Sequence, residues 1–207
     1  EVMANAITLI RMPLLIAIVV LLHHPNPSIR LILAPVIAVL IGMDSLDGFI
    51  ARKRGQTSVL GSVLDIAADR TVEFVLWVVF ADLDLISLAV PVIVIIRGIF
   101  VDAIRSVAPA HGLAPFELMR SDLGRFLVKS PWLRTPYAVV KAMAFILLTM
   151  QSAVSVVPPV LNPGGNGLYL AAQIATWLSV LFCLVRGIPV LIEGSTVLAE
   201  QDEADEA

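Results

Sequence analysis

The sequence predicts an all-α integral membrane protein with six transmembrane helices. This prediction rests on the composition, on six long apolar runs and on the turn residues between them. Of the 207 residues, 58% are hydrophobic and 15% are charged, and the mean hydropathy is +0.93. A soluble domain usually carries about a quarter charged residues, so this chain cannot cover itself with a polar surface. The composition excludes a soluble enzyme, a disordered protein and a disulfide-stapled secreted module. The net charge of −3 gives no reason to expect a nucleic-acid partner.

The first three apolar runs cover residues 4–22, 29–51 and 57–81. A helix needs roughly 20 apolar residues to cross the core of a bilayer, and each run meets that length. The segment from His23 to Pro27 contains two prolines and cannot continue a helix, and a short turn near residues 53–57 separates the second run from the third. No basic segment precedes the first run, so we expect no cleaved signal peptide. Because the chain starts without methionine, we expect its natural N-terminus to lie upstream.

The last three runs cover residues 85–105, 135–157 and 167–193. Prolines and glycines between residues 158 and 167 separate the final two runs. Residues 109–134 mix prolines, a tryptophan and basic residues, which fits either an interfacial helix or a lid, and the sequence leaves both open. The acidic tail, from about residue 198 to 207, is expected to be a solvated end. No repeat or low-complexity tract is present, so we expect residues 1–207 to form a single domain.

Lysines and arginines predict how the helices are oriented, because basic residues accumulate in cytoplasmic connectors. The opposite connectors contain only Arg30, whereas the connectors after the second and fourth runs are basic: Arg52, Lys53, Arg54, Arg120, Arg125, Lys129 and Arg134. We therefore expect these two connectors and both termini to face the cytoplasm, and the chain to reside in the cytoplasmic (inner) membrane.

Four aspartates interrupt the second and third runs: Asp44, Asp47, Asp65 and Asp69. An aspartate inside a spanning helix costs at least about 2.5 kcal/mol, so such residues are functional candidates. The members of each pair are three or four residues apart and share a helix face, and the short turn brings both pairs to a similar depth. Two such charges about 5 Å apart repel by roughly 3 kcal/mol at an effective dielectric near 20. Carboxylates favour hard ions, so the cluster predicts Mg²⁺ or Mn²⁺, and four acids suit a two-metal site.

These aspartates form part of a longer pattern, Asp44-x2-Asp47-Gly48-x2-Ala51-Arg52-x8-Gly61-x3-Asp65-x3-Asp69. Gly48, Ala51 and Gly61 leave room for a flat ligand or a close helix, and Arg52 offers a planar donor fork to a phosphate. The pattern matches in full the signature of the CDP-alcohol phosphotransferases, which make phospholipid head groups in membranes. Eight fixed positions over about 26 residues make the resemblance specific.

The resemblance implies a membrane fold of six transmembrane helices with an active site that faces the cytoplasm. It also implies that the protein forms a homodimer. It also implies CDP-diacylglycerol or a related CDP-lipid as the donor and a small polar alcohol as the acceptor. Asp44, Asp47 and Asp65 would ligate the metals, and Asp69 would lie near the second ion and act as general base. Arg52 would hold the pyrophosphate, and a nucleotide-lining set would complete the donor site: Gly48, Ala51, Ser58 and Gly61. Asn5-x2-Thr8-x2-Arg11 resembles the opening of the phosphatidylglycerophosphate and phosphatidylinositol branches, which adds Asn5 and Thr8 to that site.

Four cations inside the predicted spans are candidates for binding the acceptor: Arg97, Arg105, Lys141 and Arg186. All four fall in the cytoplasmic half by the predicted topology, so they would suit an acceptor with its own phosphate, such as glycerol 3-phosphate or an inositol phosphate. Three alternatives stay open: snorkelling of these side chains to the interface, an unphosphorylated acceptor such as inositol or serine, and a cation transporter that uses the same acids.

Overall fold

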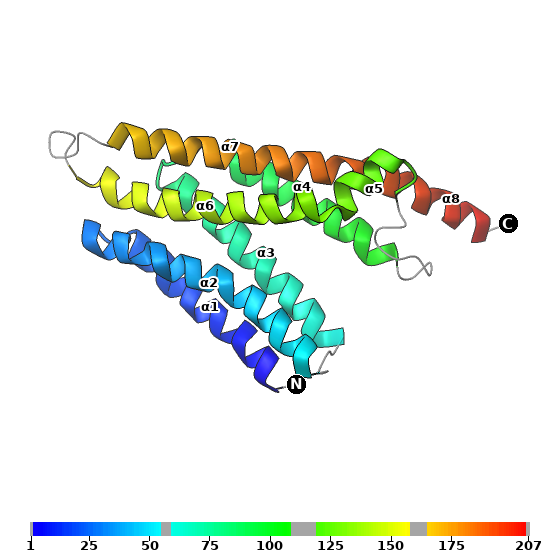
Figure 1. Cartoon of the computed structure of the whole chain (residues 1–207), viewed down its shortest axis with the longest axis horizontal. Coiled ribbons are helices and arrows are strands. Elements are labelled where there is room, and N and C mark those ends of the chain that lie inside the picture. The colour runs from blue at the N-terminus through cyan, green and yellow to red at the C-terminus, as the bar shows by residue number, and fades with distance from the viewer. Residues whose placement is uncertain (1, 55–58, 109–118, 158–164, 206–207) are drawn as a thin grey trace. The chain divides into compact units, whose positions relative to one another are not determined.

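The computed structural model describes residues 2–54, 59–108, 119–157 and 165–205, and some of the side chains within them lie outside the description. All regular structure in these ranges is helical, and each of the six predicted runs coincides with one long helix (Figure 1). Two further helices, α5 and α8, lie outside those runs. The helices are α1 (Val2–Leu22), α2 (Pro27–Arg54), α3 (Val59–Asp82), α4 (Ala89–Val107), α5 (Asp122–Lys129), α6 (Pro131–Ser155), α7 (Gly165–Pro189), the π-helical turn η3 (Val190–Gly194) and α8 (Ser195–Asp205).

Local chemistry sets the boundary between α1 and α2. The Oδ1 of Asn26 accepts a hydrogen bond from the amide of Ser28 at 2.9 Å, which satisfies one of the free donors at a helix start. Pro27 occupies the first helical position, where its missing N–H costs nothing. The predicted break between residues 23 and 27 is confirmed.

Two helices among the described residues are long and apolar enough to cross a membrane, Leu133–Ser155 and Asn166–Glu200. The apolar helical segments Ile10–Leu22 and Pro27–Met43 are shorter. By length and composition alone, the two longer helices fit a membrane protein. Crossing by all six long helices, and the orientation of the termini, stay predictions.

The first compact unit of the chain comprises residues 1–91 and 142–175. Helix α1 packs against both α2 and α3. Trp77 of α3 and Phe145 of α6 pack in the core with their ring planes tilted by 58° and their ring centroids 4.6 Å apart. Arg30 is buried and donates to the carbonyl oxygens of His24 at 2.8 Å and Ser152 at 2.9 Å, which ties the start of α2 to α6.

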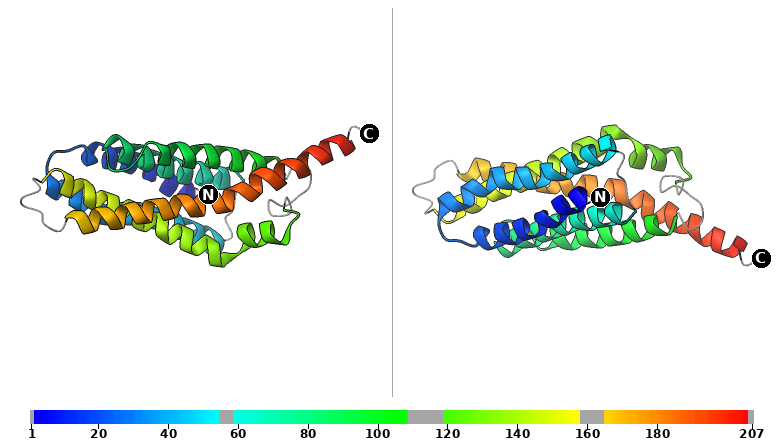
Figure 2. Two further views of the ribbon diagram at one scale, coloured as in Figure 1. Left: turned by 90° about the horizontal axis from the view of Figure 1, so that it is seen from above. Right: turned by 90° about the horizontal axis from the view of Figure 1, so that it is seen from below.

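The second unit comprises residues 92–141 and 176–207. Its core contains Val101 from α4, Met119 from the approach to α5, and Val190 and Val197 from η3 and α8. The turn η3 interrupts the α-helical hydrogen bonding between α7 and α8, and Figure 2 shows α8 continuing the course of α7 to the C-terminus. The residues of the predicted acidic tail thus continue the helix as far as Asp205.

Candidate active site

The four aspartates lie on two consecutive helices of the first unit. Asp44 and Asp47 are on α2 and Asp65 and Asp69 on α3. Helix α2 ends at Arg54 and α3 begins at Val59. The two helices of the expected hairpin are therefore present, and each pair of aspartates is one turn apart along its own helix, while the direct pairing of α2 with α3 stays a prediction.

The pair on α3 occupies a partly enclosed position. Asp65 and Asp69 are both half-buried, as is Gly61 one turn before Asp65. Half-buried carboxylates one turn apart, in a helix otherwise rich in apolar residues, fit the oxygen ligands that a hard divalent ion requires. Among the side chains that the structure describes, no group of three or more His, Cys, Asp or Glu residues could hold a metal ion. The side chains of Asp44 and Asp47 lie outside that description, so the four-carboxylate cluster stays a prediction.

Helix α3 continues into a buried ion pair just beyond the aspartates. Glu73 is 1% exposed and accepts a hydrogen bond from the guanidinium of Arg70 at 3.0 Å. A buried carboxylate is tolerated when it is paired and hydrogen-bonded. This pair fixes Arg70 along the helix one residue after Asp69.

The remaining donor-site candidates belong to the same unit. Gly48, Ala51 and Arg52 lie on α2, and Asn5 and Thr8 lie on α1, but their side chains fall outside the described set. Ser58 falls in the undescribed connection between α2 and α3. Because α1 packs against both helices of the aspartate hairpin, the helix that carries Asn5 and Thr8 is a direct neighbour of both.

Two of the predicted acceptor-binding cations meet around one aromatic ring in the second unit. The Nζ of Lys141 lies 5.6 Å from the ring centroid of Tyr137, and the guanidinium carbon of Arg186 lies 5.9 Å from it. Arg186 also donates to the carbonyl oxygen of Val128 at 3.4 Å. Cations at this distance over a ring face are attracted by its quadrupole, so Tyr137 holds one cation from α6 and one from α7.

A third cation, Arg97 of α4, packs against α7 at Gly187. Arg97 is 7% exposed, and its stem lies so close to Gly187 that a Cβ atom there would come within 2.6 Å of the arginine Cγ. The buried Nε of Arg97 has no hydrogen-bond partner within the described part of the chain. A buried donor without an acceptor costs about 1–3 kcal/mol, which is a reason to expect an anion at this position.

The fourth cation, Arg105, is half-buried in the last turn of α4, where a positive charge complements the helix dipole. All four cations thus belong to the second unit, and all four aspartates to the first. Tyr137 and Gly187 were not among the predicted residues. The four-residue spacing of Tyr137 and Lys141 on one helix is a signal for that contact, whereas nothing local in the sequence points to the pairing of Gly187 with Arg97.

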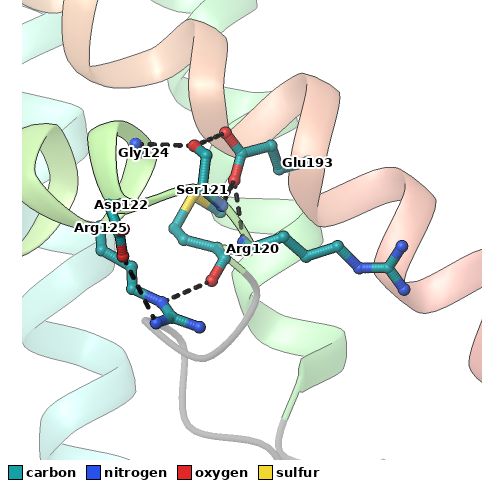
Figure 3. Close-up of polar contacts among 7 residues, drawn as sticks. Arg120, Ser121, Asp122, Gly124, Arg125 and Glu193 are labelled. Carbon is teal, nitrogen blue, oxygen red and sulfur yellow. Dashed lines mark hydrogen bonds and ion pairs between the residues drawn. The ribbon is translucent and has the colours of Figure 1, made fainter.

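A polar cluster at the start of α5 was also not predicted (Figure 3). Glu193 of η3 accepts hydrogen bonds from the amides of Arg120 at 2.9 Å and Ser121 at 3.0 Å, and from the Ser121 hydroxyl at 2.5 Å. The Ser121 oxygen in turn accepts from the amide of Gly124 at 2.9 Å, as an N-cap residue does. Arg120 forms an ion pair with Glu200 of α8. The start of α5 is thereby attached to η3 and α8.

Comparison with known proteins agrees with the residue pattern of the hairpin. The family model described as CDP-alcohol phosphatidyltransferase matches residues 1–185. This range includes all four aspartates and three of the four candidate acceptor-binding cations, Arg97, Arg105 and Lys141. A search of curated proteins for individual relatives returned no match. The chain therefore belongs to the CDP-alcohol phosphatidyltransferase family, whose members transfer a phosphatidyl group from a CDP-linked lipid to an alcohol.

Proposed function

We propose that this protein transfers the phosphatidyl group of CDP-diacylglycerol to the hydroxyl of a small phosphorylated alcohol, either glycerol 3-phosphate or an inositol phosphate, and releases CMP. Family membership supports the type of reaction. The position of Arg97, buried and with its Nε lacking an acceptor, supports a phosphorylated rather than a neutral acceptor.

The reaction is a displacement at the phosphorus atom that carries the diacylglycerol. The acceptor hydroxyl oxygen forms a new bond to this phosphorus, and the bond to the bridging oxygen of CMP breaks. Asp69 accepts the hydroxyl proton, which is the role of a general base. Because Asp69 is half-buried on α3, its carboxylate is partly shielded from bulk water.

Two Mg²⁺ or Mn²⁺ ions fit the carboxylate donor set of the hairpin. Asp44, Asp47 and Asp65 would hold them, with Asp69 beside the second ion. Such ions neutralise phosphate charge and stabilise a departing phosphate when they are bound. Arg52 would bind the pyrophosphate, and Gly48, Ala51, Gly61 and Ser58, with Asn5 and Thr8, would line the nucleotide.

The acceptor phosphate would bind the cations of the second unit. Arg97 offers donors from a buried position, and Tyr137 orients Lys141 and Arg186. A charge-assisted hydrogen bond is stronger than a neutral one, so an acceptor with a phosphate gains more from these residues than free inositol or serine would.

We further propose that all six long helices cross the inner membrane, with both termini and the aspartates on the cytoplasmic side, and that the protein works as a homodimer. The two long apolar helices and the asymmetry of the basic connectors support the topology.

The decisive experiment measures CMP release and the lipid product from purified protein supplied with CDP-diacylglycerol. The acceptors are glycerol 3-phosphate, inositol phosphate, inositol and serine, each with Mg²⁺, with Mn²⁺ and after chelation. We expect metal-dependent turnover with one of the phosphorylated acceptors. Turnover with inositol or serine alone would contradict the acceptor proposal, and absence of CMP release with every acceptor would contradict the activity itself.

Asp69→Asn tests the proposed base. We expect turnover to fall by about 10²- to 10⁴-fold, the range for loss of general base catalysis, while CDP binding is retained. Asp122→Asn is the matched control, because the Asp122 side chain is fully exposed on α5. Normal turnover in Asp69→Asn would remove the residue from the mechanism.

A further inference from the structure

Helix α5 has an apolar face that the protein covers only in part. On a helical projection, the residues from Asp122 to Lys129 separate into an apolar arc and a polar arc. Val128 at one edge of the apolar arc packs against the core of the second unit. Phe126 at the other edge is 58% exposed. Transfer of this side chain into an apolar environment outside the described part of the chain would be favourable.

The C-terminal end of α5 lies next to a helix that is long enough to cross a membrane. The Ser130 amide donates to the Phe126 carbonyl at 3.0 Å and closes α5. Ser130 is extended (φ −62°, ψ 123°), so the chain changes direction before Pro131 begins α6. The apolar span Leu133–Ser155 starts four residues after Lys129, within about 14 Å of chain. If α6 crosses the bilayer, α5 lies at its surface.

The contacts at the N-terminal end of α5 give a second estimate of the depth of α5 relative to the bilayer. Glu193, which binds the start of α5, lies 27 residues after Asn166 in the apolar helical segment Asn166–Glu200. At 1.5 Å per residue this is about 40 Å, whereas the hydrocarbon core is about 30 Å thick. Glu193 therefore lies about 10 Å past a core that begins at Asn166, at the outer edge of the head-group layer. Both ends of α5 thus fall in one narrow layer.

The charge of this segment complements an anionic lipid surface. Residues 120–134 contain four basic residues and one acidic residue. Arg125 and Arg134 are exposed, and the polar arc that carries Arg125 adjoins the apolar arc. Basic residues beside an apolar face are typical of helices that lie in a membrane interface.

We propose that α5 lies flat in the head-group layer of an anionic membrane surface, with Phe126 inserted among the upper acyl chains and with Arg125 and Arg134 on lipid phosphates. The contacts of Glu193 with Arg120 and Ser121 hold the helix at this depth. The proposal requires that α6 and α7 enter the membrane, but it is independent of which alcohol the protein uses.

A nitroxide at position 126 tests the location of α5. The full-length Phe126→Cys variant is spin-labelled in nanodiscs that contain phosphatidylglycerol, and its accessibility to oxygen and to a water-soluble nickel complex is measured. Ala199→Cys, an exposed position on α8, is the matched control. The wild-type chain, whose Cys183 is 1% exposed, is labelled in parallel as the background. We expect oxygen to dominate at position 126 and the nickel complex at position 199.

The opposite results each overturn the proposal. Equal nickel accessibility at both positions would place Phe126 in water. Protection of position 126 from both reagents would indicate that protein, such as a second copy of the chain, covers this face. Because the CMP-release assay is a separate measurement, failure here leaves the proposed activity untouched.

Lipid composition tests the charge component. Replacing phosphatidylglycerol with phosphatidylcholine is expected to lower the ratio of oxygen to nickel accessibility at position 126, because each basic residue near an anionic surface shifts the bound population by about fivefold. The variant Arg125→Gln/Arg134→Gln is expected to show little dependence on the lipid. If the accessibility ratio of the double variant changes with lipid composition as much as that of the parent, these arginines do not interact with the anionic lipids.

Discussion

Gly187 lies where α7 contacts the buried Arg97, and replacing it with alanine tests the role of that arginine without altering its charge. The added Cβ would come within 2.6 Å of the Arg97 Cγ and 3.0 Å of its Cδ, and still closer to its Nε. The clash involves the middle of the side chain rather than its mobile tip. The whole guanidinium must therefore shift to accommodate one methyl group.

The structure sets the size of the effect. Overpacking a well-packed site typically lowers stability by about 1–3 kcal/mol. Alanine stabilises a helix by about 1 kcal/mol relative to glycine, which offsets part of that loss. We therefore expect a loss of stability of up to about 2 kcal/mol. If Arg97 binds the acceptor phosphate, displacing it removes a hydrogen bond to a charged group, which is worth roughly 1.5–3 kcal/mol. This corresponds to a rise of about 10- to 150-fold in the KM for a phosphorylated acceptor.

The assay is steady-state CMP release as a function of acceptor concentration, with thermal unfolding in detergent as the measure of stability. Gly167→Ala is the matched control, because it lies on the same helix and a Cβ there meets nothing within 4 Å. The control should keep the wild-type KM, and its free energy of unfolding should rise by up to about 1 kcal/mol. An unchanged acceptor KM in Gly187→Ala, with stability raised as in the control, would refute the proposed role of Arg97.

Three further predictions concern the ion pairs and the helix cap. Glu193→Gln should speed hydrogen exchange of the Arg120 and Ser121 amides, which donate to Glu193, by up to about tenfold, since hydrogen bonds to a carboxylate are roughly twice as strong as those to the neutral amide that replaces it; unchanged exchange would show that this contact is dispensable. The Val19 carbonyl and the Asp82 carboxylate raise the pKa of His23 above 6.5. The bridge to Asp82 is therefore fully stabilising below pH 6.5 and is lost as pH rises through the raised pKa. Because both side chains are exposed, the difference in unfolding free energy between pH 5.5 and 8 should be a few tenths of a kcal/mol, and His23→Gln should remove it. Glu73→Ala should lower the free energy of unfolding by about 2 kcal/mol, because its arginine partner loses a buried acceptor; an unchanged melting temperature would contradict this.

The sequence predicts the long helices well, because apolar length and proline position are local signals. The break at residues 23–27 follows from Pro25 and Pro27 alone. The pairing of Glu73 with Arg70 follows from a three-residue spacing on one helix. The aspartate pattern on α2 and α3, which we propose to be catalytic, is likewise visible in the sequence, since its spacing places each pair of aspartates on one helix face.

The contacts of α5 are not predictable in this way. Helix α5 has eight residues, fewer than an isolated helix needs to be stable in water, and its N-cap residue Ser121 donates to Glu193, 72 positions later. The π-helical turn that presents Glu193 has no local sequence signature. The approach of Arg97 to Gly187 joins residues 90 positions apart, which only the packing of α4 on α7 brings together.

The π-helical turn Val190–Gly194 gives the end of this chain an unequal tolerance of length changes. A wide turn accommodates one more residue than an α-helical turn, so deleting one residue here would restore regular winding and leave Glu200 at about the same angle relative to Arg120. An inserted residue would instead rotate everything downstream by about 100°, which would swing Glu200 away from Arg120. Natural variation in this stretch should consequently accept single deletions more readily than insertions.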